Sequence, residues 1–261
     1  MKTLGLVGAG AMARALASGW GPSFVCMDAG SGRAVRLAEE LGGRATTSPA
    51  ELVKASDIVL LVHPPNALTE VAERFRSRAP RIVVSVLSRV SQADVGAAYP
   101  RSSVVRVEPS TLVSVRSGAI LVVEPPDGAT RTAFDEARKL FDRLGTVVVV
   151  DEARMVAASA ISGVGPALWS LLIEAQVDAG IRHGLTAEQA SELAVATMAG
   201  SAELLAAERY DTLLVRRAVM APGGATARGL ASLEASGARV AMAKAIDEII
   251  GPQERPRRSK R

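Results

Sequence analysis

The chain has 261 residues, of which 48% are hydrophobic and 22% are charged. This length suits one large domain or two small ones, and the composition is that of an ordinary globular enzyme. With only four Phe, two Trp and two Tyr, the chain has few rings on which nucleic-acid bases could stack. We therefore expect a core built mainly from Ala, Val and Leu, and no nucleic acid as a partner.

The formal net charge of +4 comes from the last ten residues. Residues 252–261 contain five basic side chains and one acidic side chain, whereas the two kinds balance over the rest of the chain. Such a tail can contact RNA, DNA or acidic lipid. It can also be a solvated, disordered end, because no apolar residue anchors it. We favour the second interpretation.

Signals for export, membrane insertion and disulfide formation are weak. The single cysteine, Cys26, cannot form an internal disulfide, and its apolar neighbours indicate an inert thiol in a buried strand. No apolar run approaches the ~20 residues that cross a bilayer, and the chain enters a strand almost at once, so no signal peptide is expected. We expect a cytoplasmic protein without a membrane partner.

The first half of the chain alternates short apolar runs with helical patterns. Continuous apolar runs are typical of parallel strands covered on both faces, and their alternation with helices predicts an α/β fold with a doubly wound, mostly parallel Rossmann sheet. The expected helices are 12–19, a helix ending near Leu41, 66–78 and 129–143. The expected strands are Leu4–Val7, Phe24–Met27, Ile58–Val62, Arg81–Leu87, Val104–Val107, Ala119–Val123 and Thr146–Val150.

After Asp151 the strand pattern stops and only helical patterns follow. The second long helix begins with a capping box, Thr186 to Gln189. The apolar stretch 166–208 is a core helix pair or an intersubunit interface, and we modestly favour the interface. We expect a dinucleotide-binding domain at 1–150, an all-α substrate and dimerisation domain at 151–250, and a basic tail at 251–261. The expected helices are 155–161, 166–182, 187–208, 212–219, 227–236 and 238–250.

The turn after the first strand carries the strongest chemical signal. Gly8 permits a tight turn, and Gly10 lets the backbone approach a pyrophosphate. The following helix presents its N–H groups at Ala11 and Met12 to the same anion. Ala13 stands where a third small residue keeps helix and strand close. This arrangement predicts a nicotinamide dinucleotide site.

The second strand ends at an acidic residue, Asp28, which lies 18 residues after Gly10. A carboxylate there accepts hydrogen bonds from the ribose hydroxyls and repels a 2′-phosphate, which favours NADH. Arg33 follows closely and could hold that phosphate, and Asp28 could simply cap the next helix. The cofactor is therefore NAD(P)H, with a slight preference for NADH.

Two loops are rich in glycine, and both precede helices. The segments 162–166 and 221–226 present free N–H groups and suggest a substrate that bears a carboxylate. His63, at the carboxyl end of a strand, can contact a cofactor edge, whereas His183 in a last helical turn fits the helix dipole. No Cys/His cluster is present in the sequence, so no metal site is expected.

Taken together, these residues resemble pyrroline-5-carboxylate reductase over about residues 3–250. The resemblance implies reduction of a cyclic imine to proline and an intertwined dimer formed by the helical half. It also implies that the Pro-Gly-Gly loop holds the substrate carboxylate while the Thr226 hydroxyl meets the ring nitrogen. The motifs are Gly8–Ala13, Ser56–Pro64, Val104–Pro109, Ser162–Ala167, Glu174–Ala175, Asp178–Gly180, Gly184–Leu185, Pro222–Thr226 and Leu233–Glu234.

Several positions depart from the family pattern near the expected cofactor and substrate. Three interpretations remain open: a divergent working reductase, a changed substrate for which Glu108 stabilises a cationic iminium, or a paralogue with impaired catalysis and a regulatory role. The departures are Ser88-Arg89 for Ala-Gly, Glu108-Pro109-Ser110 for Met-Pro-Asn, Val164 and Ala221 for serines, and Leu168 for an aromatic residue.

A competing class, the β-hydroxyacid dehydrogenases, needs a lysine acid/base in the helical half. No lysine occurs between Asp151 and Ala243, which disfavours that chemistry. We expect an oxidoreductase acting on C=N bonds, most simply on 1-pyrroline-5-carboxylate, with another cyclic imine as the alternative. The expected site residues are Thr226 for catalysis; Gly8, Gly10, Ala11, Met12, Asp28, Val62, His63 and Pro64 for the cofactor; and Glu108, Gly163, Gly223, Gly224, Ala225 and Thr226 for the substrate.

Overall fold

The computed structural model describes residues 2–125 and 130–251, and it forms two compact units. The first unit comprises residues 1–163 and the second residues 164–261. The helix after the last strand thus belongs to the first unit, whereas the sequence suggests a domain boundary near residue 150, which stays a prediction. The basic tail expected from the sequence lies, from Pro252 onward, outside the described residues.

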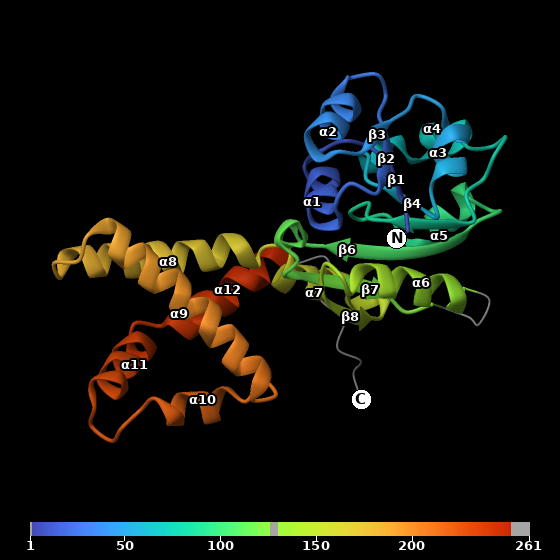
Figure 1. Cartoon of the computed structure of the whole chain (residues 1–261). Coiled ribbons are helices and arrows are strands. Elements are labelled where there is room, and N and C mark those ends of the chain that lie inside the picture. The colour runs from blue at the N-terminus through green and yellow to red at the C-terminus, as the bar shows by residue number, and fades with distance from the viewer. Residues whose placement is uncertain (1, 126–129, 252–261) are drawn as a thin grey trace, which may run out of the picture. The chain divides into compact units, whose positions relative to one another are not determined.

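The first unit contains an eight-stranded sheet in the order β3-β2-β1-β4-β5-β6-β7-β8 (Figure 1). All neighbouring strands are parallel except β6 and β7, so the predicted mostly parallel Rossmann sheet is confirmed. The strands are β1 Leu4–Val7, β2 Phe24–Met27, β3 Arg44–Ala45, β4 Ile58–Leu61, β5 Ile82–Ser85, β6 Ser103–Pro109, β7 Gly118–Val123 and β8 Gly145–Val150.

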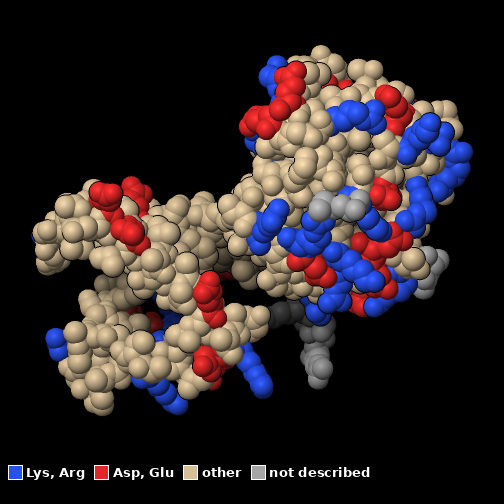
Figure 2. Space-filling view, in the orientation of Figure 1, with Lys and Arg blue, Asp and Glu red and all other residues tan. Residues whose placement is uncertain are grey.

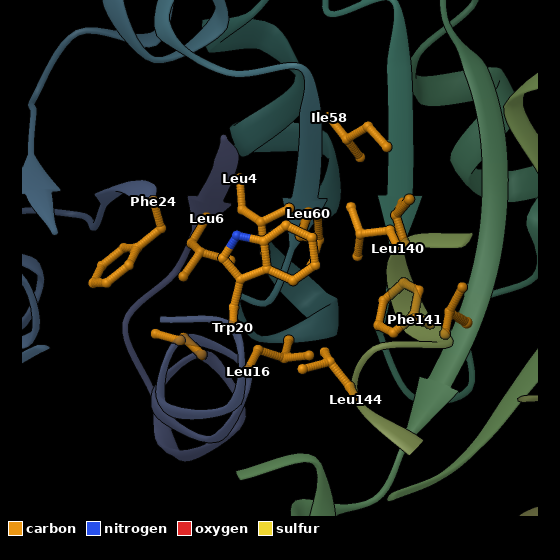
Figure 3. Close-up of a cluster of buried hydrophobic side chains, with 14 of the residues drawn as sticks. Leu4, Leu6, Leu16, Trp20, Phe24, Ile58, Leu60, Leu140, Phe141 and Leu144 are labelled. Carbon is orange, nitrogen blue, oxygen red and sulfur yellow. The ribbon is translucent and has the colours of Figure 1, made fainter. Parts of the chain in front are cut away.

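Helices cover both faces of this sheet. One face packs against α1, α2 and α6, and Figure 3 shows Leu16 and Trp20 of α1 beside Leu4 and Leu6 of β1. The other face packs against α3, α4 and α5, and α7 extends that layer over β7 and β8. The first-unit helices are α1 Ala11–Trp20, α2 Arg33–Leu41, α3 Pro49–Ala55, α4 Leu68–Arg74, α5 Gln92–Ala98, α6 Arg131–Phe141 and α7 Met155–Ser162.

Three short elements are absent from the sequence-based expectation: β3, α3 and α5. The two helices have seven residues each, too few to show a helical period, and they are defined by their starts. Ser48 caps α3, with Pro49 at its first position. Ser91 and Asp94 form a reciprocal capping box at α5. Local capping thus fixes helices that hydrophobic spacing does not reveal.

The second unit consists of helices whose starts and ends follow the expected pattern closely. The capping box of Thr186 and Gln189 is confirmed. One start differs: α11 begins at Ala225, because Gly224 is extended and serves as its N-cap, so Thr226 lies in the first helical turn. The helices are α8 Gly165–Arg182, α9 Ala187–Ala207, α10 Thr212–Ala218, α11 Ala225–Ala235 and α12 Ala238–Ile250.

Little of the second unit is buried. Among its described residues the buried apolar side chains are Ala190 and Ala194, whereas many large apolar side chains are exposed. Leu171 is 62% exposed and Leu193 57%. A helical unit that hides so little of its apolar surface requires a further covering surface, since burial of apolar area is the main stabilising contribution to folding.

One stretch of the described residues is long and apolar enough to span a membrane by length and composition alone, although the sequence shows no continuous apolar run of that length. Glu152–Arg182 contains an 18-residue window whose length and composition suit a spanning helix, with a mean hydropathy of 1.7 for that window, 11% of which is buried. The stretch includes both α7 and α8, and Gly163 and Val164 between them interrupt it. Its exposed apolar side chains include Trp169, Leu171 and Leu172.

Candidate dinucleotide and substrate site

The glycine turn lies at the carboxyl edge of β1, beside the end of β4. Gly8 donates its N–H to Met27 at 2.8 Å, and Val62 donates to Val7 at 3.0 Å, so three strand ends are held together. Gly8 has a φ of +121°, and a Cβ there would lie 2.6 Å from the carbonyl oxygen of Val62. Only glycine fits this position, because both the backbone conformation and the neighbouring strand exclude a side chain.

Gly10 plays a different part in the same turn. It is the extended N-cap of α1, and a Cβ built on it would meet nothing within 4 Å. The space in front of Gly10 is therefore open to a ligand. The first turn of α1 begins at Ala11 and Met12, whose N–H groups have no intrahelical acceptor and face outward along the helix axis. Ala13 is fully buried, which keeps α1 close to the sheet.

A cavity of about 500 Å³ opens in front of this turn. Its walls come from the carboxyl ends of β1, β2 and β4 and from one face of α4. A crevice at this edge of a doubly wound sheet is where dinucleotides bind. The lining residues are Val7, Gly8, Ala9, Gly10, Met27, Asp28, Ala29, Ser31, Arg33, Val62, His63, Pro64, Ala67, Glu70, Val71 and Arg74.

Asp28 lines the cavity and also caps α2. Its carboxylate accepts hydrogen bonds from the N–H groups of Gly30, Arg33 and Ala34 at 2.9, 2.8 and 3.2 Å and from the Ser31 hydroxyl at 2.6 Å. Desolvation opposes ionisation of Asp28, but these hydrogen bonds outweigh it and lower the pKa. The carboxylate is thus a fixed negative charge in the cavity wall, and capping, one of the two roles that the sequence allows, is present.

His63 supplies a buried acceptor to the same cavity. Its Nδ1 lies 2.9 Å from the Pro64 carbonyl oxygen, which can only accept, so Nδ1 carries the proton. Its Nε2 is buried and has no hydrogen-bond partner among the described residues. Burial lowers the pKa of His63, although the bond to Pro64 raises it. A neutral ring with one unpaired acceptor fits a hydroxyl or amide donor of a bound dinucleotide.

The strand register shows which other side chains share this edge. Because these strands are parallel, positions beyond their last paired residues project toward the same crevice. The last paired residues form one row across five strands: Met27 of β2, Val7 of β1, Leu61 of β4, Ser85 of β5 and Arg106 of β6.

Glu108 lies two residues beyond this row, on β6. Its carboxylate accepts a hydrogen bond from the hydroxyl of Ser159 on α7 and lies 3.8 Å from the guanidinium of Arg106. The next polar residue, Ser110, is 3% exposed, and its hydroxyl has no partner among the described residues. The sequence gives no signal for the contact with Ser159, because the two residues lie 51 positions apart.

Arg89, after the end of β5, adopts a φ of +60°. This is the left-handed conformation that glycine adopts without strain and that arginine adopts at an energetic cost. The family pattern described above has glycine at this position. Arg89 thus has a backbone conformation that suits glycine and adds a cationic side chain beyond the end of β5.

The Pro-Gly-Gly loop belongs to the second unit. Gly223 has a φ of +70°, and its carbonyl oxygen accepts a hydrogen bond of 2.7 Å from Arg228. Gly224 donates its N–H to Ala221 at 3.0 Å. These bonds hold the loop against the start of α11. The N–H groups of Ala225 and Thr226 lie in the first turn of this helix, where they have no intrahelical acceptor. Such an N-terminus suits a carboxylate.

The structure therefore groups the expected cofactor residues only in part. Gly8, Gly10, Asp28, Val62, His63 and Pro64 line one cavity, whereas Ala11 and Met12 begin α1 beside it. Gly163 is the C-cap of α7, and the loop 223–226 lies in the other unit. Four further cavity residues are not among the expected site residues: Ala67, Glu70, Val71 and Arg74. Their helical spacing directly after His63-Pro64 is the signal that could have revealed them.

Among the described residues no group of three or more His, Cys, Asp or Glu side chains could hold a metal ion. Cys26 is fully buried, and burial raises the pKa of its thiol to about 11. The thiol is therefore protonated at neutral pH and unsuited to act as a nucleophile.

Comparison with known proteins identifies both halves of this arrangement. The family described as pyrroline-5-carboxylate reductase dimerisation matches residues 152–254, and the family described as NADP oxidoreductase coenzyme F420-dependent matches residues 3–89. The pyrroline-5-carboxylate reductase of Synechocystis is 31% identical over 93% of this chain and 94% of its own length. That of Mycobacterium leprae is 30% identical over 94% of each chain.

Solved structures agree in fold. A pyrroline-5-carboxylate reductase from Coxiella burnetii superposes with a TM-score of 0.82 at 24% identity, covering 95% of this chain and 96% of its own. The Plasmodium falciparum pyrroline carboxylate reductase with NADP bound has a TM-score of 0.76 at 24% identity and covers 95% of each chain. The chain therefore belongs to the pyrroline-5-carboxylate reductase family.

Proposed function

We propose that this protein reduces 1-pyrroline-5-carboxylate to L-proline with a nicotinamide dinucleotide as hydride donor. The observation that carries the proposal is similarity over nearly the whole chain to reductases of this name, at 31% identity for the Synechocystis protein. The cavity at Gly8 and Gly10 fits the dinucleotide, since it combines an open backbone approach, free helix N–H groups and the unpaired acceptor of His63.

The reaction makes few demands on acid–base side chains. A cyclic imine is readily protonated, which leaves its carbon electrophilic, and the bound nicotinamide supplies the hydride. The protein then needs to orient the substrate and to provide a polar partner for the ring nitrogen. We assign the carboxylate of the substrate to the N–H groups of Ala225 and Thr226, and the ring nitrogen to the hydroxyl of Thr226.

One assay tests this function. Purified protein is mixed with racemic pyrroline-5-carboxylate and either NADH or NADPH, and the loss of dinucleotide absorbance is followed. We expect turnover with at least one dinucleotide and proline as the product. Turnover with only an unsubstituted or six-membered imine would replace the proline assignment by a related imine reductase. Dinucleotide binding without turnover of any imine would indicate the impaired paralogue.

The dinucleotide preference follows from charges in the cavity wall, and we retain the slight preference for NADH. The Asp28 carboxylate repels a 2′-phosphate, whereas Arg33 and Arg74 line the same cavity and attract it. Arg33 donates through Nε to the Ser31 hydroxyl at 3.0 Å, which holds its guanidinium near Asp28.

Asp28→Asn should raise NADPH affinity relative to NADH by about tenfold, because it removes a charge repulsion of roughly 1.4 kcal/mol. The amide oxygen can still cap α2, so the fold should persist. Dissociation constants of both dinucleotides, measured by fluorescence titration, check this expectation. Arg33→Ala is the matched variant and should change the ratio in the opposite direction. An unchanged ratio in both variants would remove these residues from the 2′ position.

The helical unit supports homo-oligomerisation, and we propose a homodimer formed through it. Its described part buries few apolar side chains, and Figure 2 shows a largely uncharged surface on its visible face. Lys and Arg alternate with Asp and Glu on the first unit, which does not favour nucleic acid. We assign the apolar surface of Glu152–Arg182 to the subunit interface rather than to a membrane, because Glu174, Asp178 and Arg182 lie along it. A cytoplasmic enzyme is consistent with this assignment.

Leu171→Ala should weaken the dimer by at least tenfold, because each subunit would lose the burial of one leucine side chain. Sedimentation equilibrium over a range of concentrations measures this change. Val35→Ala, which truncates a 50% exposed apolar side chain on α2, is the matched control and should leave the dimer intact. Equal dissociation constants for the wild type and Leu171→Ala would place the interface elsewhere.

A further inference from the structure

A buried guanidinium on β6 already has one carboxylate partner. Arg106 is 7% exposed, and its Nη1 lies 2.8 Å from Oε1 of Glu152. Gln92 of α5 binds both residues: its amide oxygen accepts from the backbone N–H of Arg106 at 3.2 Å, and its backbone N–H donates to Glu152 at 2.8 Å. The charge of Arg106 is therefore compensated by Glu152, as a buried charge requires.

Glu108 is the second carboxylate beside this guanidinium. Its Oε2 lies 3.8 Å from Nη2 of Arg106, which is longer than a hydrogen bond. Its Oε1 is held by the hydroxyl of Ser159. The three charged groups, Arg106, Glu108 and Glu152, sum to one negative charge, and the Glu108 side chain is 24% exposed. Glu108 thus presents a surplus, oriented negative charge in a partly desolvated position.

The position of Glu108 in the sheet places its charge on the side of the crevice toward which the nicotinamide extends. Glu108 lies two residues beyond the row formed by the last paired residues of β1, β4 and β5. Its strand, β6, is the fourth strand from β2 in the sheet order. Three strand spacings separate β1 from β6, or roughly 14 Å along the crevice. Asp28 at the end of β2 fixes the adenosine side of the dinucleotide, and Gly10 fixes the pyrophosphate. The nicotinamide therefore extends along the edge toward Glu108.

We propose that Glu108 is a specificity-determining residue that favours cyclic imines bound as iminium cations, a proposal that rests on the function given above. A carboxylate near a protonated ring nitrogen stabilises the cation and raises the pKa of the bound imine by about one unit at a partly exposed position. An imine without a carboxylate of its own, such as 1-pyrroline, gains most, because pyrroline-5-carboxylate carries its own neutralising charge. Ser159 and Arg106 are positioning residues for Glu108.

The test compares the wild type with Glu108→Gln in the full-length protein. The amide keeps the shape and the acceptor for Ser159, while the charge is removed. The alkaline limb of kcat reports deprotonation of the bound iminium cation. It should move to lower pH by about one unit in Glu108→Gln, because the cation has lost the carboxylate that stabilises it. The limb of kcat/KM reports free substrate and should keep its position, while its height falls about tenfold for 1-pyrroline and less for pyrroline-5-carboxylate.

The wild type and Glu108→Gln share every other ionisable group at the carboxyl edge of the sheet. Arg106 and Glu152 stay in place, and His63, whose lowered pKa keeps it neutral in the alkaline range, is unchanged. Glu39→Gln is the matched control, since it removes an exposed carboxylate on α2, which packs beside β2 and β3 at the other end of the strand order. Glu108→Asp should recover part of the shift. Ser159→Ala should produce a smaller shift in the same direction, and Ser159→Thr should restore the wild-type profile.

Each outcome bears on one of the two proposals. Superposed kcat profiles for the wild type and Glu108→Gln overturn the role of Glu108 and leave the reductase activity standing. Loss of activity without movement of the limb assigns Glu108 a merely structural role and also overturns the proposal. If the wild type does not reduce pyrroline-5-carboxylate, the proposed function fails, and the same comparison with 1-pyrroline still tests Glu108. Turnover of neither imine overturns both.

Discussion

Gly10→Ala should lower NAD(P)H affinity on the order of 100-fold while the protein remains folded. The reason is that the two sides of Gly10 differ. On the protein side a Cβ meets nothing within 4 Å, and the φ of −87° suits alanine. On the ligand side the same Cβ occupies the space through which a pyrophosphate reaches the first turn of α1.

Two measurements separate these effects. Fluorescence titration gives the dissociation constant, and thermal unfolding should show a loss of about 1 kcal/mol or less, which is the cost of alanine at a helix N-cap. Gly96→Ala, inside α5, also has an open Cβ position; it should leave the dissociation constant unchanged and raise stability by up to about 1 kcal/mol, because alanine favours the helix. Gly8→Ala is the contrasting variant, because its Cβ collides with the Val62 carbonyl and should destabilise the fold itself. Tight binding by Gly10→Ala would exclude a close backbone contact there.

Thr226→Ala should reduce kcat on the order of 100-fold, the usual effect of removing one polar group that meets the reacting centre. Thr226 is exposed in the first turn of α11, and its hydroxyl makes no hydrogen bond recorded within the described residues. Its loss should therefore leave the unfolding midpoint unchanged. Steady-state kinetics with pyrroline-5-carboxylate check the expectation.

Two further substitutions at this position identify the group responsible. Thr226→Ser keeps the hydroxyl and should retain most of the turnover, whereas Thr226→Val keeps the shape and should be as slow as Thr226→Ala. If Thr226→Val turns over like the wild type, the hydroxyl has no part in hydride transfer. If all three variants are slow, the position serves packing or loop geometry instead.

The long elements of this fold were predictable because each repeats one pattern many times. The apolar runs of β1, β2 and β4 reveal buried parallel strands, and the helical spacing of α8 and α9 persists over 18 and 21 residues. By contrast, β3 has two residues and shows no pattern. The start of α11 was placed too late because Pro222-Gly223-Gly224 reads as a loop that continues through Thr226, whereas Gly224 already caps the helix.

The site residues likewise differ in whether a local sequence pattern reveals them. The glycine turn and Asp28 are encoded locally, by strand, turn and helix in succession, so the sequence suffices to locate them. The second role of Asp28, as the cap of α2, was one of two local alternatives, and only the geometry shows that the loop amides use its oxygens. The partners of Glu108 come from elements distant in sequence, and no local pattern joins β6 to Ser159.

The small buried area of the second unit has a consequence for how subunits exchange. Helices that bury little within one chain depend on the surface of a partner for most of their apolar cover, so separating two subunits amounts to unfolding that part of each. Exchange between preformed oligomers then proceeds at the rate of local unfolding rather than of diffusion. We therefore expect differently labelled oligomers mixed in the native state to exchange slowly, and mixed oligomers to form faster when both chains refold together.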